Sequence, residues 1–394
     1  MYAFFLDWLN LLFRWAHLIV GIGWIGTSFY FIALDLSLRK REKMNPGVYG
    51  TAWEVHGGGF YHVEKYLVAP GQLPDDLIWY KWEAYLTWVT GFCLLIVQYY
   101  ANARAYLISP DVLPMVPVEA ILISLLSLFG GWFVYDRFLC RSWIGREPTR
   151  LAVAVFVLII LAAYFYTHVF SPRGAFIHIG AFIGTLMAFN VFRVIMPNQR
   201  KAVAQLIAGE TVDPIYGQIA KQRSVHNNYL TLPVLVMMVS NHYSMVIGHP
   251  HAWMIAALII VMGASIRHFL NRHEAGDPLN KIAWTLPLAA AALVIMIGMT
   301  MPKTSADGVA VMSNDEVLAL TAKHCTMCHS AKPTHTGFNE APKGLILDNI
   351  ALIKQNGQMI MAQAVQSDVM PLGNETGFTK ADREALGAWI LANQ

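Results

Sequence analysis

Long apolar runs alternate with short polar stretches over the first three hundred positions of the chain. Each run holds about 20 residues, the length at which a helix crosses a hydrocarbon core of roughly 30 Å. The pattern therefore predicts a bundle of eight membrane-spanning helices. The predicted spans lie near residues 8–34, 82–100, 118–139, 150–170, 174–197, 224–244, 252–271 and 282–302.

The pattern changes after residue 302. Hydropathy falls, and residues 303–312 read as a short polar linker. The remainder, 313–394, predicts a small helical domain whose first helix begins at Ser313 with Glu316 three residues later, a capping-box pattern. Its last helix begins near Thr379. A domain of about 80 residues with few large apolar side chains is only marginally stable by itself, so we expect a bound group to fill its core.

Composition agrees with a membrane protein. Of the 394 residues, 56% are hydrophobic and only 13% are charged, a balance far from that of soluble globular domains. The first 26 residues lack a basic start and a small-residue cleavage site, so they predict a retained first helix. Cys93 and Cys140 lie in or at the end of predicted spans, where a lone thiol usually packs as a small hydrophobe.

Lysine and arginine residues predict the orientation, because basic loops stay on the cytoplasmic side. They gather after the first, third, fifth and seventh spans, whereas the opposite loops hold Arg104 and Arg173, and Lys303 opens the tail. We therefore expect both termini outside the cytoplasm. The net charge of +3 follows from this topology and does not indicate nucleic-acid binding. The cytoplasmic set is Arg39, Lys40, Arg41, Lys43, Lys65, Lys81, Arg137, Arg141, Arg146, Arg150, Arg193, Arg200, Lys201, Lys221, Arg223, Arg267, Arg272 and Lys281.

The tail carries the sequence CTMCH from Cys325 to His329, the C-x-x-C-H pattern of c-type haem attachment. Thiols three residues apart, at Cys325 and Cys328, can form thioethers with the two vinyl groups on one edge of a porphyrin. The adjacent imidazole of His329 then ligates the iron. The tail is accordingly predicted to be a class I cytochrome c-like domain with one covalent haem c.

The sixth iron ligand is predicted to be Met370, in a proline-containing loop about forty residues downstream. A His/Met pair raises the reduction potential and suits electron transfer. Met359 and Met361 are the rivals, but both fall in a predicted helix and are expected to pack. The haem iron would therefore be held by His329 and Met370.

Two other uses of the cysteine pair are a zinc site and a redox-active dithiol. Zinc would require four ligands, and only His324 and His335 lie near in sequence. A thioredoxin-like site would require alternating strands and helices. Haem c is attached outside the cytoplasm, where the charge pattern independently places this tail, so we favour haem.

The first span has the densest polar face of the membrane half. Ionisable groups at membrane depth normally face a bundle interior or a cavity. For His17 a packing role, a haem ligand and, with Arg14 one turn away, part of an anion site all stay open. The polar face consists of Asp7, Asn10, Arg14, His17, Gly21, Trp24 and Ser28, at intervals of three and four.

Two other stretches concentrate polar residues. WEVHGGGFYHVEK, residues 53–65, sets two histidines and two glutamates around three glycines in the first cytoplasmic loop. SVHNNYLTLPVLVMMVSNHYS, residues 224–244, places histidine and asparagine at both ends of the sixth span around a kink at Pro233. Neither stretch is a metal signature by its spacing.

These segments carry a resemblance. RWAHLIVGIGWIGTSFYF in the first span, HGGGFY, HNNYLTLPVL, SNHY and the cytochrome-like tail, in this order, resemble the membrane-bound bacterial urate oxidases, also called urate hydroxylases, with a fused cytochrome c. The resemblance implies oxidation of urate to 5-hydroxyisourate in purine catabolism at the bacterial inner membrane, with the tail in the periplasm. Electrons would pass through the tail to a respiratory cytochrome c or terminal oxidase without forming peroxide.

Candidate catalytic residues follow from the resemblance and from the needs of urate, a planar monoanion that requires a cation, amide partners and aromatic faces. They are Arg14, His17, His226 and Asn227, with Asn10, Trp15, Trp24, Asn228 and Tyr229 as neighbours that could assist. The first span is also similar, more distantly, to small membrane oxidases of porphyrinogens that use a first-helix histidine. That analogy implies a second, non-covalent haem b, for which His17, His178 and His242 are the candidate ligands.

Two other functions compete with this prediction. One is a membrane-anchored electron-transfer subunit that relays electrons from quinol or a partner complex. An anchor needs only one or two spans and no polar helix faces, so the eight predicted spans favour an enzyme. The other is a transporter with a redox sensor, which predicts matched, broken half-repeats that the sequence lacks.

Overall fold

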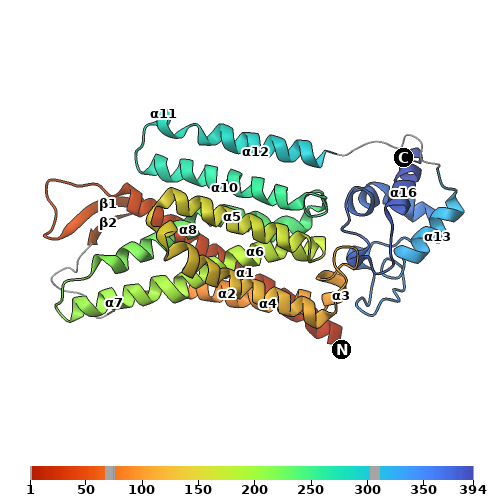
Figure 1. Ribbon diagram of the computed structural model, residues 1–394, viewed down its shortest axis with the longest axis horizontal. Helices are drawn as coiled ribbons and strands as arrows, with labels where there is room; N and C mark the ends of the chain where they lie inside the picture. Colours follow the sequence, from red (N-terminus) through yellow and green to blue (C-terminus); the bar gives the residue numbers. More distant parts are fainter. Residues whose placement is uncertain (1, 67–73, 75, 302–310, 394) are drawn as a thin grey trace.

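The computed structural model describes residues 2–66, 74, 76–301 and 311–393. Figure 1 shows a bundle of long helices that run side by side, with a β-hairpin at one end and the tail domain at the other. We call residues 2–301 the bundle and residues 311–393 the tail. Most of the predicted linker, residues 303–310, lies outside the described residues.

All eight predicted spans are helical. They are α1 (Tyr2–Ser37), α2 (Trp82–Leu94) continued by η1 (Leu95–Tyr100), α4 (Pro117–Phe133) continued by η2 (Val134–Cys140), α5 (Pro148–Thr167), α6 (Pro172–Phe189) continued by η4 (Asn190–Ile195) and α7 (Met196–Ile207), α8 (Pro214–Val239), α10 (Ala252–Glu274) and α12 (Thr285–Thr300). Short connecting helices are α3 (Ala103–Tyr106), η3 (Trp143–Arg146), η5 (Ser240–His242), α9 (Ser244–Ile247) and α11 (Leu279–Ile282).

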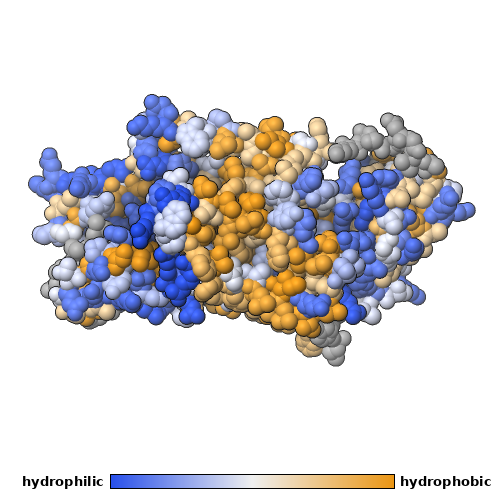
Figure 2. Space-filling view, in the orientation of Figure 1, coloured by the Kyte–Doolittle hydropathy of each residue, from blue (hydrophilic) through white to orange (hydrophobic). Residues whose placement is uncertain are grey.

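Six helices of the described chain are long and apolar enough to cross a membrane: Phe4–Ser37, Pro117–Cys140, Pro148–Thr167, Pro172–Ile207, Ala252–Glu274 and Leu279–Thr300. The second and sixth predicted spans fall outside this group. In α8, the first half carries several polar residues that the span prediction had assigned to a loop. Figure 2 shows an orange apolar band across the middle of the bundle, with hydrophilic surface on both sides of it.

The core of the bundle is built around α6, which packs on α4, α5 and α8. Its Phe176, Ile179, Ile183 and Leu186 are fully buried. By contrast, α1 packs mainly on α2 and leaves many large apolar side chains exposed. The bundle is therefore apolar both in its core, around α6, and on its outer surface, as Figure 2 shows. This combination is expected of helices surrounded by lipid.

The glycine-rich segment is not a loop but an antiparallel hairpin of β1 (Val48–His56) and β2 (Gly59–Tyr66). Gly57 and Gly58 form its two-residue turn with φ of +59° and +81°, the left-handed region that tight hairpin turns require. Val55 faces Phe60 across the hairpin, and β-branched and aromatic residues of this kind suit a pleated strand. The all-α prediction is therefore wrong for this segment, although the described chain is mostly helical.

The tail contains α13 (Asn314–His324), α14 (Ile350–Gln355), α15 (Gly357–Ile360), α16 (Lys380–Ala392) and the short turns η6 (Pro342–Gly344), η7 (Met361–Val365) and η8 (Leu372–Asn374). The predicted capping box is present, because Ser313 and Glu316 bond reciprocally at the start of α13. Thr379 caps α16. Val317, Leu347 and Trp389 lie in a small buried core.

The tail rests on one end of the bundle. Asn374 hydrogen-bonds Asp111, and Ser244 Oγ donates to the Ala362 carbonyl at 3.2 Å. The first turn of α1 lies at this same end in Figure 1. The start of α1 and the tail therefore lie at the same end of the bundle.

Candidate functional site

A large crevice lies where the tail meets the bundle. Its volume is about 820 Å³, within the range of roughly 300–1,000 Å³ typical of cofactor and ligand pockets. Cys325, Cys328 and His329, which are near neighbours in sequence, and Met370, from a separate part of the tail, all line it. The structure thus brings together the four predicted attachment and ligand residues. Tyr106 and Arg173 line the same crevice from the bundle, so its wall is shared by both domains.

His329 is oriented by a backbone contact. Its Nδ1 lies 3.1 Å from the Leu345 carbonyl oxygen and must donate to it, which leaves the Nε2 lone pair available. Metal-ligating histidines are commonly held in this way. Burial lowers the pKa of His329 below its ordinary value of 6.5, although the hydrogen bond to Leu345 opposes this effect. The neutral, ligating form is therefore favoured at neutral pH.

The methionine candidates differ in position. Met370 lines the crevice, and its backbone is fixed by hydrogen bonds of 2.9 Å to the Gln363 carbonyl and 2.6 Å from Arg383. Met359 also lines the crevice but is 49% exposed. Met361 and Met370 both pack against the tail core, but Met361 does not line the crevice. This arrangement favours Met370 as the sixth ligand.

The cysteine environment is unlike that of a redox dithiol. Burial raises the pKa of the Cys325 thiol to about 12, and burial also raises the pKa of Cys328. Catalytic dithiols instead lower the pKa of the attacking thiol. Across the residues that the structure describes, no group of three or more His, Cys, Asp or Glu side chains is placed to hold a metal ion, so the zinc alternative gains no support.

The chemistry of the crevice fits a haem. Its lining combines apolar side chains such as Leu347 and Phe378, which form most of its surface, with polar side chains such as Gln355 and Gln363. His324, which is 2% exposed, also lines it. Its Nδ1 lies 2.7 Å from Thr376 Oγ1, while its buried Nε2 has no partner among the described residues. Such an orphaned group at the wall of an apolar crevice requires an explanation, and a bound group with polar edges supplies one.

A second set of polar residues is buried inside the bundle, toward its hairpin end. We call it the Arg223 cluster, and it consists of Tyr135, Asp136, Asn190, Arg223, His226 and Asn227. Tyr135 Oη lies 2.6 Å from His226 Nδ1 and accepts from Asn190 Nδ2 at 2.9 Å. Asn190 Nδ2 also donates to Asn227 Oδ1 at 3.0 Å. Three helical segments, η2, η4 and α8, thus meet through one hydrogen-bond network.

The Arg223 cluster carries excess positive charge. Arg223 Nη2 and Arg141 Nε each lie 2.8 Å from Asp136, and Arg137 Nε lies 3.9 Å from it, so one carboxylate faces three guanidinium groups. Nε and Nη1 of Arg223 are buried and have no partner among the described residues. Oδ1 of Asn190 is likewise unpaired. The cluster therefore offers free donors, a free acceptor and a positive field inside the bundle.

Adjacent residues of α8 support a neighbouring network. Asn228 Oδ1 accepts from Arg267 Nε at 3.1 Å and from Asn271 Nδ2 at 2.7 Å. Tyr229 Oη lies 2.7 Å from His268 Nδ1. Consecutive helical residues point about 100° apart. Asn227 therefore belongs to the Arg223 cluster, whereas Asn228, on the same helix, belongs to the network with Arg267 and Asn271.

The other two predicted catalytic residues lie elsewhere, in the seam between α1 and α2. Arg14 Nη2 donates to Gln98 Oε1 at 2.6 Å, and Arg14 Nε bonds Asn10. His17 Nδ1 lies 2.9 Å from the Thr87 carbonyl, and a side chain at Gly91 would collide with its ring. The shared polar face is confirmed, but it packs on α2. No described contact joins Arg14 or His17 to His226 and Asn227.

The histidines considered for a second haem are dispersed. His178 is fully buried, with Nδ1 bonded to the Gly174 carbonyl at 2.7 Å and Nε2 lying 2.6 Å from Ser124 Oγ. Both ring nitrogens therefore have hydrogen-bond partners within the bundle, and His178 as a haem b ligand stays a prediction. His242 lies at the end of η5, and His17 lies on α1. A second haem stays a prediction.

Sequence reasoning missed much of the Arg223 cluster. Arg223 and Arg267 had been counted as loop charges, but they lie in α8 and α10 and are 1% and 4% exposed. The available signal was Asp136, an ionisable residue inside a predicted span, which marks a functional site by default. His56 and His62 belong to the exposed hairpin, where Trp53 stacks on His62 at 4.4 Å.

No curated protein and no solved structure matches the chain. One family does: the family model described as urate oxidase N-terminal matches residues 3–301. This range covers the Arg223 cluster, the α1–α2 seam and the bundle side of the crevice, and it ends before the tail. Because the match spans most of the sequence, the chain belongs to the urate oxidase N-terminal family.

Proposed function

We propose that this chain is a membrane-embedded urate oxidase that transfers electrons from urate to a c-type haem in its own tail. The observation that carries the proposal is the shared crevice. Cys325, Cys328, His329 and Met370 line it from the tail, whereas Tyr106 and Arg173 line it from the domain that the urate oxidase family matches. An electron acceptor in this crevice would touch the catalytic domain directly.

The proposed reaction is urate plus water to 5-hydroxyisourate, two protons and two electrons. The new oxygen comes from water, so oxygen gas is not consumed and peroxide is not formed. A haem supplies one-electron acceptance, so two transfers follow each turnover. The electrons then pass to a respiratory cytochrome c or a terminal oxidase. The resemblance of the whole sequence and the apolar band of Figure 2 support a place in the bacterial inner membrane, with the tail in the periplasm.

The Arg223 cluster has the chemistry that urate binding requires. The unpaired nitrogens of Arg223 suit an anionic substrate, and the free Oδ1 of Asn190 suits an N–H of the purine ring. The ring of Tyr135, which packs 5.1 Å from the Arg223 guanidinium, supplies an aromatic wall. His226 lies within hydrogen-bond distance of the Tyr135 hydroxyl and is the candidate to move protons. We therefore place the substrate here and not in the α1–α2 seam.

Electrons must then travel from the Arg223 cluster to the opposite end of the bundle. A single hop across a core of roughly 30 Å would be inefficient, so a relay is needed. A series of neighbouring side chains, most of them aromatic, leads from Phe189 toward the crevice. Phe189, next to Asn190, lies 5.4 Å from Trp88, which stacks on Phe92 at 5.1 Å. Phe92 lies 6.5 Å from Tyr100.

The second half of the series ends at the crevice. The hydroxyl of Tyr100 lies 2.7 Å from Ser124 Oγ, which contacts His178 Nε2. His178 lies 6.4 Å from Tyr99, and Tyr99 lies 6.2 Å from Tyr106. Because Tyr106 lines the crevice, the series of contacts runs from Phe189, the chain neighbour of Asn190, to the proposed haem site.

The test is to mix oxidised, detergent-purified protein with urate in the absence of oxygen and to record the visible spectrum. We expect the reduced c-type band to grow, with two haems reduced per urate consumed. His329→Ala, which removes the proximal ligand, should show no such band. If urate leaves the spectrum unchanged while dithionite reduces the haem, the chain is an electron relay for another donor. The same spectra give the haem content, and only one c-type haem per chain would exclude haem b.

A further inference from the structure

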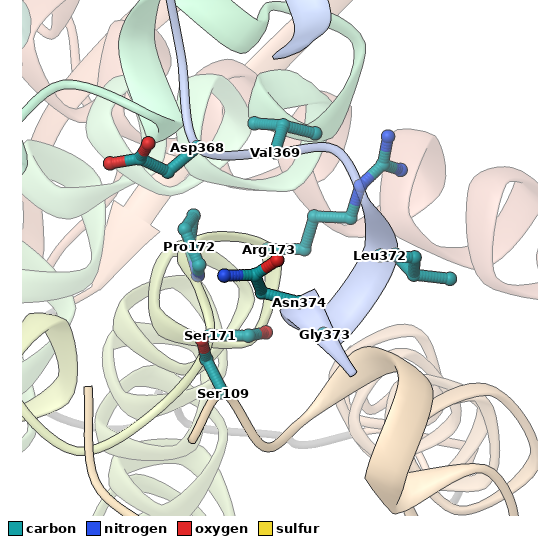
Figure 3. A pocket seen from close by; sticks show the side chains of 9 residues that line it. All are labelled: Ser109, Ser171, Pro172, Arg173, Asp368, Val369, Leu372, Gly373 and Asn374. Carbon is teal, nitrogen blue, oxygen red and sulfur yellow. The ribbon is translucent and has the colours of Figure 1, made fainter. Parts of the chain in front are cut away.

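Among the described residues of the bundle, Arg173 is the one cation that lines the crevice. It belongs to the first turn of α6 and also lines a small pocket between the bundle and the tail. Figure 3 shows its side chain extending from α6 toward the tail loop that carries Val369 and Leu372. The guanidinium is therefore held between the two domains, at the wall of the proposed haem site.

Arg173 has no partner for its charge within the described part of the chain. Its Nε is buried without a hydrogen bond, and no ion pair reaches it. The nearby carboxylates serve other groups. Asp111 bonds Asn374, and Asp368 lies 3.3 Å from Arg383 Nε. Glu375, which also lines the crevice, lies 3.4 Å from His335 Nε2. A partly buried, unpaired guanidinium is costly, so a carboxylate from outside the protein chain would stabilise it.

The position of Arg173 is fixed by its neighbours. Ser171 Oγ donates to the Tyr106 carbonyl at 2.6 Å, and Ser171 N donates to the Leu107 carbonyl at 2.9 Å. A side chain at Gly174 would meet these same two carbonyls at 3.2 Å, so α6 approaches the α3 segment closely. Tyr106 and Arg173, which line the crevice from the bundle together with Ala105, are thus held as one rigid edge.

We propose that Arg173 binds a carboxylate of the group that fills the crevice, which for a haem is a propionate. This inference rests on the proposed function, because it takes haem as the occupant. Its consequence is that the haem site is incomplete in the tail alone. The bundle supplies the counter-ion, and the haem joins the two domains by a covalent attachment on one side and an ion pair on the other.

The experiment measures the haem midpoint potential by redox titration of the full-length protein, without urate, for wild type and Arg173→Gln. A positive charge at a propionate stabilises the reduced haem, so its removal should lower the potential. We expect a change approaching tenfold in the one-electron equilibrium, which corresponds to about 59 mV. An opposite charge lowers the pKa of a carboxylate by about 1–3 units, so the unpaired propionate should titrate at a higher pH than in wild type and the pH dependence of the potential should move upward.

The matched control is Arg104→Gln, which removes the same charge from the exposed face of α3 near the tail. It should change the potential little and add no pH dependence. Arg173→Lys keeps the positive charge but lacks the planar guanidinium group, and it should restore most of the midpoint potential. It serves as the test if Arg173→Gln fails to fold. Equal effects of the two glutamine substitutions, or a potential unchanged in Arg173→Gln, would overturn the inference alone. Absence of covalent haem in the wild type would instead overturn the electron-transfer part of the proposed function.

Discussion

Arg223 and Asp136, which are 87 positions apart in the sequence, form a buried ion pair with 2.8 Å between Nη2 and Oδ1. The pair joins α8 to η2 and leaves two guanidinium nitrogens unbonded. An ion pair in this setting does two things. It compensates a carboxylate that could not otherwise stay charged away from water, and it leaves two buried donors of Arg223 unbonded, with the guanidinium packed on the ring of Tyr135.

Arg223→Gln should therefore reduce both stability and urate binding. Loss of one partner leaves Asp136 buried and less well compensated, which costs about 3–5 kcal/mol in soluble proteins. The measurement is thermal unfolding in detergent together with the KM for urate. Arg137→Gln is the matched control, since Arg137 lies 3.9 Å from the same carboxylate but is largely exposed, and should cost only about 0–1 kcal/mol. Similar effects in both variants would contradict a special role for Arg223.

Tyr135→Phe tests the proton-handling part of the Arg223 cluster. The change removes a hydroxyl that serves both His226 and Asn190 while keeping the aromatic wall. We expect turnover to fall by about 10²-fold, the lower end of general acid–base contributions. Tyr229→Phe removes the same kind of hydroxyl from His268, 2.7 Å away in the neighbouring network, and should retain most activity. If only Tyr229→Phe is slow, the substrate site lies in that network instead.

Met370→Ala should leave the haem attached but remove its sixth ligand. The thioethers at Cys325 and Cys328 do not depend on the methionine, whereas Met ligation raises the potential. The expected result is an altered ligand-field spectrum and a lower midpoint potential. Met359→Ala is the control, because this half-exposed side chain lines the same crevice. Normal axial ligation in Met370→Ala would transfer the role to another methionine.

Gly373→Ala should weaken the contact between the tail and the bundle. An added Cβ would lie 2.7 Å from the Arg104 carbonyl oxygen, a backbone atom with little freedom to move. Misplacement by about 1 Å can reduce rates up to roughly 10²-fold, so urate should reduce the attached haem more slowly. The readout is stopped-flow spectroscopy of the reduced band.

Gly377→Ala is its control. Gly377 has φ of +66°, almost equal to the +65° of Gly373, but its added Cβ meets nothing within 4 Å. Both substitutions carry the backbone strain of about 1 kcal/mol, and only Gly373→Ala adds the clash. Equal rates of haem reduction in the two variants would show that docking at this point does not limit electron transfer.

The tail should lose stability in acid through Glu316. Hydrogen bonds from Ser313 lower the pKa of this carboxyl below its ordinary value of 4.5. The folded tail therefore binds fewer protons than the unfolded chain near pH 4.5, and stability declines as the pH falls below that value. Glu316→Gln should show a flatter decline, measured by thermal melts that follow the haem band. Glu340→Gln, an exposed carboxyl in the same domain, should retain the wild-type slope.

The sequence by itself determined the features that depend on near neighbours. Apolar runs of helical length predict the bundle helices, and the spacing from Cys325 to His329 predicts the attachment motif, because each lies within one element. The capping box at Ser313 is equally local. The alternating pattern between Val48 and Tyr66 also indicated a hairpin, but the three consecutive glycines favoured the prediction of a loop.

Only the tertiary structure decided which polar residues form a site. His226 joins Tyr135, Asn190 and Arg223 because η2, η4 and α8 pack together, and no sequence interval encodes that meeting. Arg14 and His17, which share a face as predicted, pack on α2 instead. Arg173 lines the crevice only because the tail packs against the bundle. Desolvation in this packed interior makes each unpaired polar group costly, and that cost distinguishes a candidate site from a polar residue in a loop.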